Sequence, residues 1–470
     1  MGATGVNVKR FAALEEFVLA RMGETHLPSV TIAAVERGET TYARGFGVRD
    51  IERSLPATPQ TRYGIGSVTK SFTCVALLQL QEQRRLRVDD PIETYLPVAV
   101  RPFGESIRLH HFMTHSSGIP ALAYAEAIIR HGSGASDRYL PMGGYDDMLT
   151  FLNGSEEWVY ARPGERWFYL NEGYVLLGAV IERVSGESYN AYIHNHILGP
   201  LRMTRTSFVA DAAGDEDIAV PYVITKDKDQ QRSHYLNGRL TSDGGLISSV
   251  EDMTAYLKML LGGGGGGAHG ATILSPPSLQ AMLGRYVTLP LEIYPGSEAM
   301  PIGHYGYGLS TYPDFFGHTL AGHGGAVLVS TAHLAFIPER DAGVVVLANG
   351  SGYALQHIAV FALASMLGED PWRIPGLRVE RALQQLEGRY ETYRGTYGAT
   401  VTRAGDFLML KIENKLLSQT VPLVPLELDP ARPRFFTLTL GRRLTVDFHV
   451  SPAGIEVIYE RYRMRRVGNV

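Results

Sequence analysis

The stretch GSVTKSF, residues 66–72, opens a helical pattern that runs on to Leu86 with apolar residues at helical spacing. Ser67 and Lys70 are three positions apart, so they share one helical face and the amine can reach the hydroxyl. A serine hydroxyl is a weak nucleophile until a neighbouring base takes its proton, and free N–H groups at a helix start stabilise an oxyanion. The stretch therefore predicts Ser67 as a nucleophile that Lys70 activates.

Two other motifs that carry a serine or a lysine do not fit this stretch. A phosphate-binding loop needs glycine directly before the Lys-Ser pair, where Thr69 stands. A nucleophile elbow needs glycine two residues before and two residues after the serine, and Ile65 and Thr69 occupy those places. A serine three residues before a lysine is common by chance, so an N-cap serine followed by a surface lysine is the simpler alternative.

A second pattern is PGERWFYLNEGY, residues 163–174, which contains Tyr169 and Asn171. A lysine cation near a phenol favours its ionised form, which makes Tyr169 a usable proton shuttle. The amide of Asn171 can orient the lysine and bind a substrate carbonyl. Taken alone, the pattern is better explained by a buried tyrosine and a turn asparagine.

The third pattern is GHGGA, residues 322–326, which leads a predicted strand. Glycines at the entry of a strand let a substrate backbone approach closely, which makes His323, Gly324 and Gly325 candidate binding residues. The N–H of Ala326 is then the expected second oxyanion donor beside the N–H of Ser67. A simple turn is the alternative for this pattern alone.

The order of the expected elements indicates an α+β fold with a sheet assembled from both ends of the chain and an all-helical lobe between them. A first domain is expected over 1–370, a linker over 371–379 and an all-β domain, with the strand spacing of a small antiparallel barrel, over 380–470. The expected elements of the first domain are helices at 9–21, 67–86, 173–184, 249–261 and 354–367 and strands at 29–36, 40–48 and within 319–348. The expected barrel strands are 399–402, 407–412, 435–440, 444–450 and 455–463.

Composition limits the partners of the chain. Apolar residues make up 45% and charged residues 20%, and the net charge is -4, so no basic field is available to hold nucleic acid or an anionic membrane. No apolar run reaches the length of a membrane span, and a cytoplasmic location is expected. The single Cys74 rules out an intramolecular disulfide. The histidines of LHHFMTH, residues 109–115, lack a matching carboxylate spacing, so neither a metal nor another cofactor is expected.

With these patterns in one order, the chain resembles the serine β-lactamase and penicillin-binding-protein superfamily, in the class C-like branch of CubicO-type peptidases, D-aminopeptidases and esterases. The resemblance covers about residues 9–367. Besides the three patterns above, it rests on LRVDDP (86–91), YLP (95–97), MTHSSGI (113–119), GY (173–174), LLG (176–178), and PL (200–201) with Met203 and Thr206.

The resemblance implies a serine hydrolase that forms an acyl-enzyme at Ser67, with Lys70 and Tyr169 as the other catalytic residues. His323 stands where many relatives have the lysine of a K-T-G motif, and a neutral histidine is the poorer partner for the carboxylate of a penicillin. A peptidase of small peptides, D-residue peptides among them, is therefore expected before a penicillin-binding protein or sensor, a carboxylesterase or a weak β-lactamase. The trailing barrel resembles the lipocalin-like domains appended to some of these peptidases. There, such domains shade the catalytic cleft, restrict substrate size or help to build oligomers. A homo-oligomer is one of the arrangements that this resemblance implies.

Overall fold

The computed structural model describes residues 4–138, 140–209, 217–235, 238, 240–265, 272–292, 300–413, 416 and 418–470. The chain divides into two compact units, of which the first takes in Met1–Leu291 and Ile302–Glu369. Asp370–Val470 makes up most of the second unit. Each unit has a hydrophobic core of its own.

The first unit is built on an antiparallel sheet in the strand order β3-β2-β1-β14-β13-β12-β11-β10-β9. Its first three strands come from the start of the chain and the rest from residues after 286, which confirms the predicted α+β fold and a sheet made from both ends. The strands are β1 Ser29–Glu36, β2 Glu39–Asp50, β3 Leu55–Pro56, β9 Val287–Thr288, β10 His304–Tyr305, β11 Ser310–Phe315, β12 His318–Ala326, β13 Thr331–Ile337 and β14 Ala342–Ala348.

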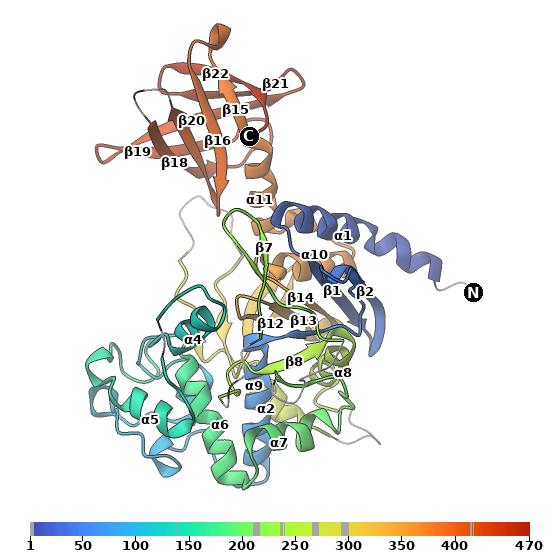
Figure 1. Ribbon diagram of the computed structural model, residues 1–470, viewed down its shortest axis with the longest axis vertical. Helices are drawn as coiled ribbons and strands as arrows, with labels where there is room; N and C mark the ends of the chain where they lie inside the picture. Colours follow the sequence, from blue (N-terminus) through green and yellow to red (C-terminus); the bar gives the residue numbers. More distant parts are fainter. Residues whose placement is uncertain are drawn as a thin grey trace. The chain divides into compact units, whose positions relative to one another are not determined.

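Helices cover both faces of this sheet (Figure 1). α10 (Leu355–Leu367) packs on β13 and β14 together with α1 (Thr4–Thr25), and α8 (Val250–Leu261) packs on β14 and β1 from the other side. α8 begins as the sequence predicts, because the Ser249 side chain accepts a hydrogen bond from the Asp252 N–H. All residues of β14 are buried, as expected for a strand between two helical layers.

A helical lobe fills the middle of the chain around α2 (Thr69–Glu82), whose residues from Thr69 to Leu80 are buried. The helix predicted from Ser67 begins instead with a 3-10 turn over Gly66–Val68, so Ser67 precedes the regular α-helix. The other helices are α3 Leu109–Met113, α4 Tyr124–Gly132, α5 Tyr145–Asn153, α6 Asn171–Ser185, α7 Tyr189–Ile193 and α9 Pro276–Met282, and the small sheets use β4 Arg62–Gly64, β5 Ser207–Phe208, β6 Tyr222–Ile224, β7 Gln230–Arg232 and β8 Leu246–Ser249.

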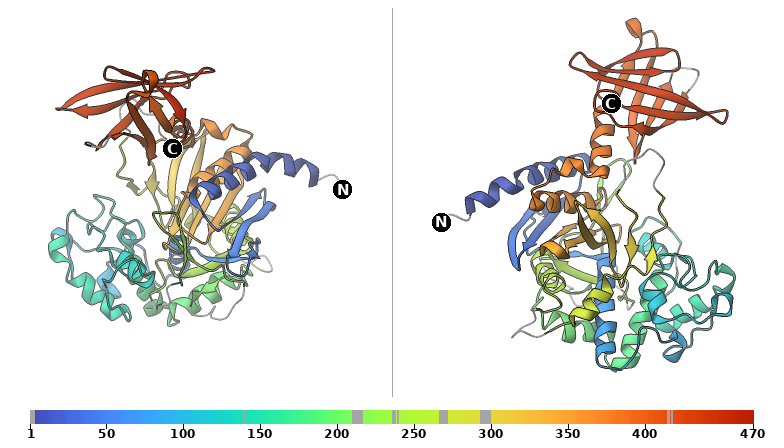
Figure 2. Two further views of the ribbon diagram at one scale, coloured as in Figure 1. Left: turned by 45° about the horizontal axis from the view of Figure 1, so that its top comes forward. Right: turned by 180° about the vertical axis from the view of Figure 1, so that it is seen from behind.

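The second unit is a closed barrel of eight antiparallel strands. Figure 2 gives two views of it. Its strands are β15 Gly388–Glu391, β16 Gly398–Ala404, β17 Phe407–Glu413, β18 Ser418–Glu427, β19 Arg434–Thr439, β20 Arg442–Ser451, β21 Gly454–Tyr459 and β22 Tyr462–Gly468. The range 455–463, predicted as one strand, contains parts of β21 and β22 with a turn between them.

The linker predicted at 371–379 needs correction. Pro371–Arg373 forms a 3-10 helix, and α11 spans Pro375–Leu386. Proline at the first position of a helix has no N–H to lose, so two prolines that resemble a linker in composition are here helix starts. Leu383 and Leu386 of α11 belong to the barrel core, which explains why the segment is ordered.

Among the described residues, none of the helices combines the length and the apolar character that a membrane crossing requires.

Candidate active site

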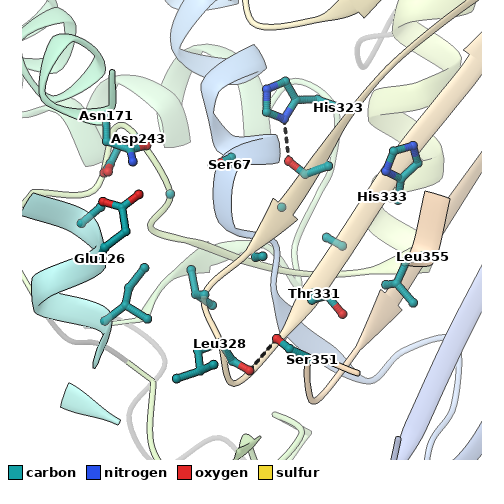
Figure 3. Close-up of a pocket in the computed structure, with 18 of the residues that line it drawn as sticks. Ser67, Glu126, Asn171, Asp243, His323, Leu328, Thr331, His333, Ser351 and Leu355 are labelled. Carbon is teal, nitrogen blue, oxygen red and sulfur yellow. Dashed lines mark hydrogen bonds between the residues drawn. The ribbon is translucent and has the colours of Figure 1, made fainter. Parts of the chain in front are cut away.

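A cavity of about 650 Å³ in the first unit collects the residues that the sequence singles out. Ser67, Tyr169, Asn171 and the strand end His323–Ala326 all line it. Figure 3 shows Ser67 near the centre of this cavity, between Asn171 on one side and β12 on the other. Lys70 follows Ser67 by three residues, in the first turn of α2, and is fully buried. The structure thus brings all the predicted site residues together, although they come from three distant parts of the chain.

Lys70 is held by three oxygen atoms. Its Nζ lies 3.0 Å from Ser67 Oγ, 2.8 Å from Asn171 Oδ1 and 2.7 Å from the backbone oxygen of Asp243. An ammonium group has three N–H donors, so each finds an acceptor and the buried cation is fully hydrogen-bonded. The arrangement places the Lys70 nitrogen within direct proton-transfer distance of the Ser67 hydroxyl.

Two glycines allow β12 to come close to the turn that carries Ser67. Gly66 has φ +50°, and a Cβ added there would lie 2.9 Å from the Ala326 nitrogen. A Cβ added to Gly325 would lie 1.9 Å from the Ile65 oxygen and 3.1 Å from the Ser67 nitrogen. Side chains at these positions would separate the strand from the turn, and with it the backbone nitrogens of Ser67 and Ala326.

His115 contacts the Tyr169 ring and both of its neighbours in the chain. The backbone oxygen of His115 accepts a hydrogen bond from the Phe168 N–H at 2.7 Å, and His115 Nδ1 accepts one from the Leu170 N–H at 3.0 Å. The two rings lie 4.0 Å apart at 32°. Lys70 Nζ is 4.8 Å from the centre of the Tyr169 ring, and the Tyr169 hydroxyl makes no hydrogen bond to any part of the chain that the structure describes.

His323 is neutral in this site. Burial, together with the positive charge of Lys70, lowers the pKa of its ring to about 3. Nδ1 lies 2.6 Å from the backbone oxygen of Gly324 and donates to it, so Nε2 accepts from the Tyr305 hydroxyl at 2.8 Å. Both ring nitrogens are therefore occupied within the protein, and the ring carries no charge with which to bind a carboxylate.

Sequence reasoning missed the acidic side of the site. Asp243 supplies the backbone oxygen that Lys70 binds, and its carboxylate accepts from the Tyr124 hydroxyl at 2.8 Å. Burial raises the pKa of the Asp243 carboxyl, an effect that the charge of Lys70 opposes. Glu172 is 1% exposed, and burial raises its pKa to about 7. The only signal in the sequence was the run TSDGG at 241–245, whose glycines indicate a turn.

The histidine-rich segment serves packing. His110 Nδ1 lies 2.8 Å from the Tyr307 hydroxyl, and His111 Nδ1 accepts from the Arg108 N–H at 3.1 Å. No cluster of three or more histidine, cysteine, aspartate or glutamate side chains suited to a metal ion occurs in the described ranges of the chain.

Comparison with known proteins agrees with this geometry. The family model for β-lactamase matches residues 14–363, about three quarters of the chain. The chain belongs to the β-lactamase family. A second model, the Pab87 octamerisation domain, matches residues 371–465 of this β-lactamase family member.

Two relatives of this family member cover most of the chain. The D-aminopeptidase of Gluconobacter oxydans (strain 621H) is 27% identical over 385 residues, which are 81% of this chain and 66% of that protein. Protein flp of Staphylococcus aureus (strain MRSA252) is 27% identical over 327 residues, 69% of this chain and 60% of that protein. The chain thus spans about 60% of the length of the curated relatives that match it first.

Solved structures show the same fold. The octameric penicillin-binding protein homologue from Pyrococcus abyssi is 41% identical, with a TM-score of 0.89 over 96% of this chain and 99% of that chain. The D-stereospecific amidohydrolase from Streptomyces sp. is 24% identical, with a TM-score of 0.61 over 76% of this chain and 98% of that chain. At that identity the second comparison shows the fold alone.

Proposed function

We propose that this protein is a serine hydrolase that acts through an acyl-enzyme on peptide, amide or ester bonds, and that its main substrates are small peptides, including peptides with D-residues. One observation carries the proposal: the fully buried Lys70 amine lies 3.0 Å from the Ser67 hydroxyl at the wall of a cavity. A buried amine costs free energy unless it is paired, so a site that holds one against a hydroxyl is a candidate for proton transfer.

In the proposed first half-reaction, Ser67 Oγ forms a bond to the substrate carbonyl carbon. Its proton passes through Lys70 to Tyr169: the Lys70 ammonium gives a proton to the Tyr169 phenolate and takes the Ser67 proton in its place. The bond to the leaving amine or alcohol then breaks, and Tyr169 gives the proton to that group. Water repeats these steps on the acyl-enzyme, which releases the acid and restores the hydroxyl of Ser67.

The oxyanion is proposed to lie between the backbone N–H groups of Ser67 and Ala326. The close approach of β12 to the Ser67 turn, which Gly66 and Gly325 allow, supports this role. Asn171 is proposed to orient Lys70, to which its Oδ1 is hydrogen-bonded at 2.8 Å, and its free amide N–H groups are available for a substrate carbonyl.

Neutral His323 supports a peptide substrate over a penicillin. A penicillin presents a carboxylate, and the uncharged His323 ring already uses both nitrogens for Gly324 and Tyr305. The similarity to a D-aminopeptidase at 27% identity supports small peptides with D-residues as the substrate class.

We further propose that the protein forms a homo-oligomer through its barrel. The match of residues 371–465 to an octamerisation domain supports this, as does the 41% identity to an octameric homologue.

A substrate screen tests the hydrolase proposal. Aminoacyl and dipeptide p-nitroanilides in both stereochemical series are compared with nitrocefin and short esters. We expect turnover by the wild type and a loss of at least about 10³-fold in Ser67→Ala, because the nucleophile is removed. Ser71→Ala is the matched control, since Ser71 lies one helical turn further on and hydrogen-bonds to Val68 and Tyr256 instead.

Full activity of Ser67→Ala would remove this serine from the mechanism. Stable labelling of Ser67 by a fluorescent penicillin without any turnover would identify a penicillin-binding receptor instead.

A further inference from the structure

The cavity at Ser67 has two halves of different chemistry. Figure 3 shows Ser67 between Glu126 and Asp243 on one side and the ends of β12, β13 and α10 on the other. The first half is charged, because Glu126 and Arg130 are exposed there and the carboxyl group of Asp243 is buried beside them. The labelled residues of the second half are Leu328, Thr331, His333, Ser351 and Leu355.

The hydroxyl groups of the second half are turned toward the backbone. Thr331 Oγ1 donates to the Gly350 oxygen at 2.8 Å, and Ser351 Oγ donates to the Leu328 oxygen at 2.6 Å. Apolar side chains such as Val327, Leu328 and Leu355 supply much of the remaining wall. This half therefore presents a largely apolar, uncharged surface.

His333 is the exception to this apolar lining. It lines the cavity and is half-buried, and burial lowers the pKa of its ring to about 4, so the ring is neutral. Within the described residues it makes no hydrogen bond. A neutral imidazole offers one N–H donor and one acceptor, so His333 has both available for a ligand.

The strand β12 has an open edge on the side away from β13. β12 pairs with β13 as far as Ala326, but with β11 only as far as Gly322. Gly324 and Ala326 are accordingly exposed. An extended peptide can add to such an edge by backbone hydrogen bonds.

Alternation along the strand decides where the side chains of such a peptide lie. Gly325 lies against the Ser67 turn, so its neighbour Gly324 faces the other side of the sheet, as does its register partner His333. A Cβ on Gly324 would lie 3.4 Å from His333 Nδ1. A peptide paired with this edge of β12 would place every second side chain on the face of His333, and between them lies only Gly324, which has no side chain.

We propose that this neutral half, formed by Val327, Leu328, Thr331, His333 and Leu355, binds an uncharged side chain of an extended peptide substrate, which makes His333 a specificity-determining residue. The inference rests on the proposed hydrolase function and deepens it by naming the substrate class. A charged side chain is disfavoured here because it would lose water without gaining an opposite charge, whereas an amide or apolar side chain fits.

Pentapeptides test this assignment. In a set of pentapeptides, each position in turn is leucine, glutamine, glutamate or lysine, and the products are followed by chromatography. The small ester p-nitrophenyl acetate is the control substrate, because its hydrolysis requires the catalytic residues but does not reach the neutral half. At one position we expect kcat/KM to favour leucine and glutamine over glutamate and lysine by about tenfold or more.

At that position alone, His333→Asp is expected to raise kcat/KM for lysine relative to leucine by about tenfold, since the new carboxylate pairs with the ammonium group. Gln356 also lines the cavity, and Gln356→Glu is expected to shift the ratio of kcat/KM for lysine to that for leucine in the same direction. Because Gln356 is exposed, this variant places no charge in a buried position. His318→Asp, at the far end of β12, is the control and should leave the profile unchanged.

Unchanged peptide profiles in both His333→Asp and Gln356→Glu would overturn the inference while the hydrolase function stands. The inference is also overturned if His333→Asp and Gln356→Glu lower the turnover of p-nitrophenyl acetate and of every peptide by the same factor. A wild-type protein that turns over neither peptides nor esters would overturn the hydrolase proposal and this inference together.

Discussion

His115 contacts the chain on both sides of Tyr169, and one of these contacts uses its side chain. We expect His115→Phe to lower kcat by about tenfold with little change in KM, because the Leu170 N–H loses its acceptor and Tyr169 is less well positioned. His115→Asn should retain most of the activity, since an amide oxygen can accept that bond and asparagine tolerates the φ of 57° found here. Steady-state kinetics of both variants measure the difference.

Equal losses in the two His115 variants would mean that the ring, not the hydrogen bond, matters. Their near-ultraviolet circular dichroism serves as the control for folding.

Glu172 gives a prediction about pH and stability. Burial raises its pKa from 4.5 to about 7, so the folded protein binds this proton more tightly than the unfolded chain does. Stability from this group is therefore greatest at low pH and is lost as the pH rises through about 7. Glu172→Gln keeps an oxygen for the Tyr124 N–H but does not titrate. Between pH 4 and pH 8, the free energy of unfolding of the variant should therefore gain up to about 3 kcal/mol on that of the wild type.

Urea unfolding of wild type and Glu172→Gln at several pH values checks this. A difference between the two proteins that stays constant with pH would contradict the assigned pKa.

Among single residues, the sequence predicted those whose contacts are local in the chain or belong to a recognisable motif. Ser67 and Lys70 are three residues apart at the start of a helix, so their spacing, together with the other motifs, predicted the contact that the structure has. The backbone oxygen of Asp243 and the side chain of His115 act through tertiary contacts with Lys70 and Leu170, and no pattern near them in the sequence encodes those partners.

The end of β12 is the element on which the site depends most. Gly325→Ala should lower kcat/KM by about a hundredfold, because its Cβ would lie 1.9 Å from the Ile65 oxygen and would displace the strand from the Ser67 turn. Gly23→Ala in α1, outside the cavity, is the control, since its Cβ would have no atom within 4 Å. Ester hydrolysis by the two variants measures the effect, and equal activities would contradict the close approach proposed for the oxyanion site.

Among the elements, the sequence predicted the long or strongly patterned ones and missed those that tertiary packing defines. β18 (Ser418–Glu427) contains Pro422 and Pro425, which weaken a strand pattern, and it forms only because β17 and β19 pair with it. α11 appeared to be a linker because its first turn begins with proline, and its order comes from Leu383 and Leu386 in the barrel core.

For the whole molecule, the prediction concerns the oligomer that we propose the barrel forms. Leu438 is 67% exposed and Leu440 is 99% exposed, and the two leucines lie close together at the turn between β19 and β20. We propose this apolar pair as part of the contact between subunits. We expect light scattering to show an oligomer for the wild type and a smaller particle for Leu438→Glu with Leu440→Glu. Ala453→Glu, in the next turn along the chain at the other end of β20, is the control. An unchanged mass would place the contact elsewhere, and a monomeric wild type would contradict the assembly.

Intact-protein mass spectrometry of the acid-quenched enzyme tests the central claim most directly. During turnover of a slow ester substrate, the account predicts a mass increase equal to the acyl group, located after digestion on the peptide that contains Ser67 and absent from Ser67→Ala. Turnover with no such adduct under any quench condition, together with undiminished turnover in Ser67→Ala, would contradict it.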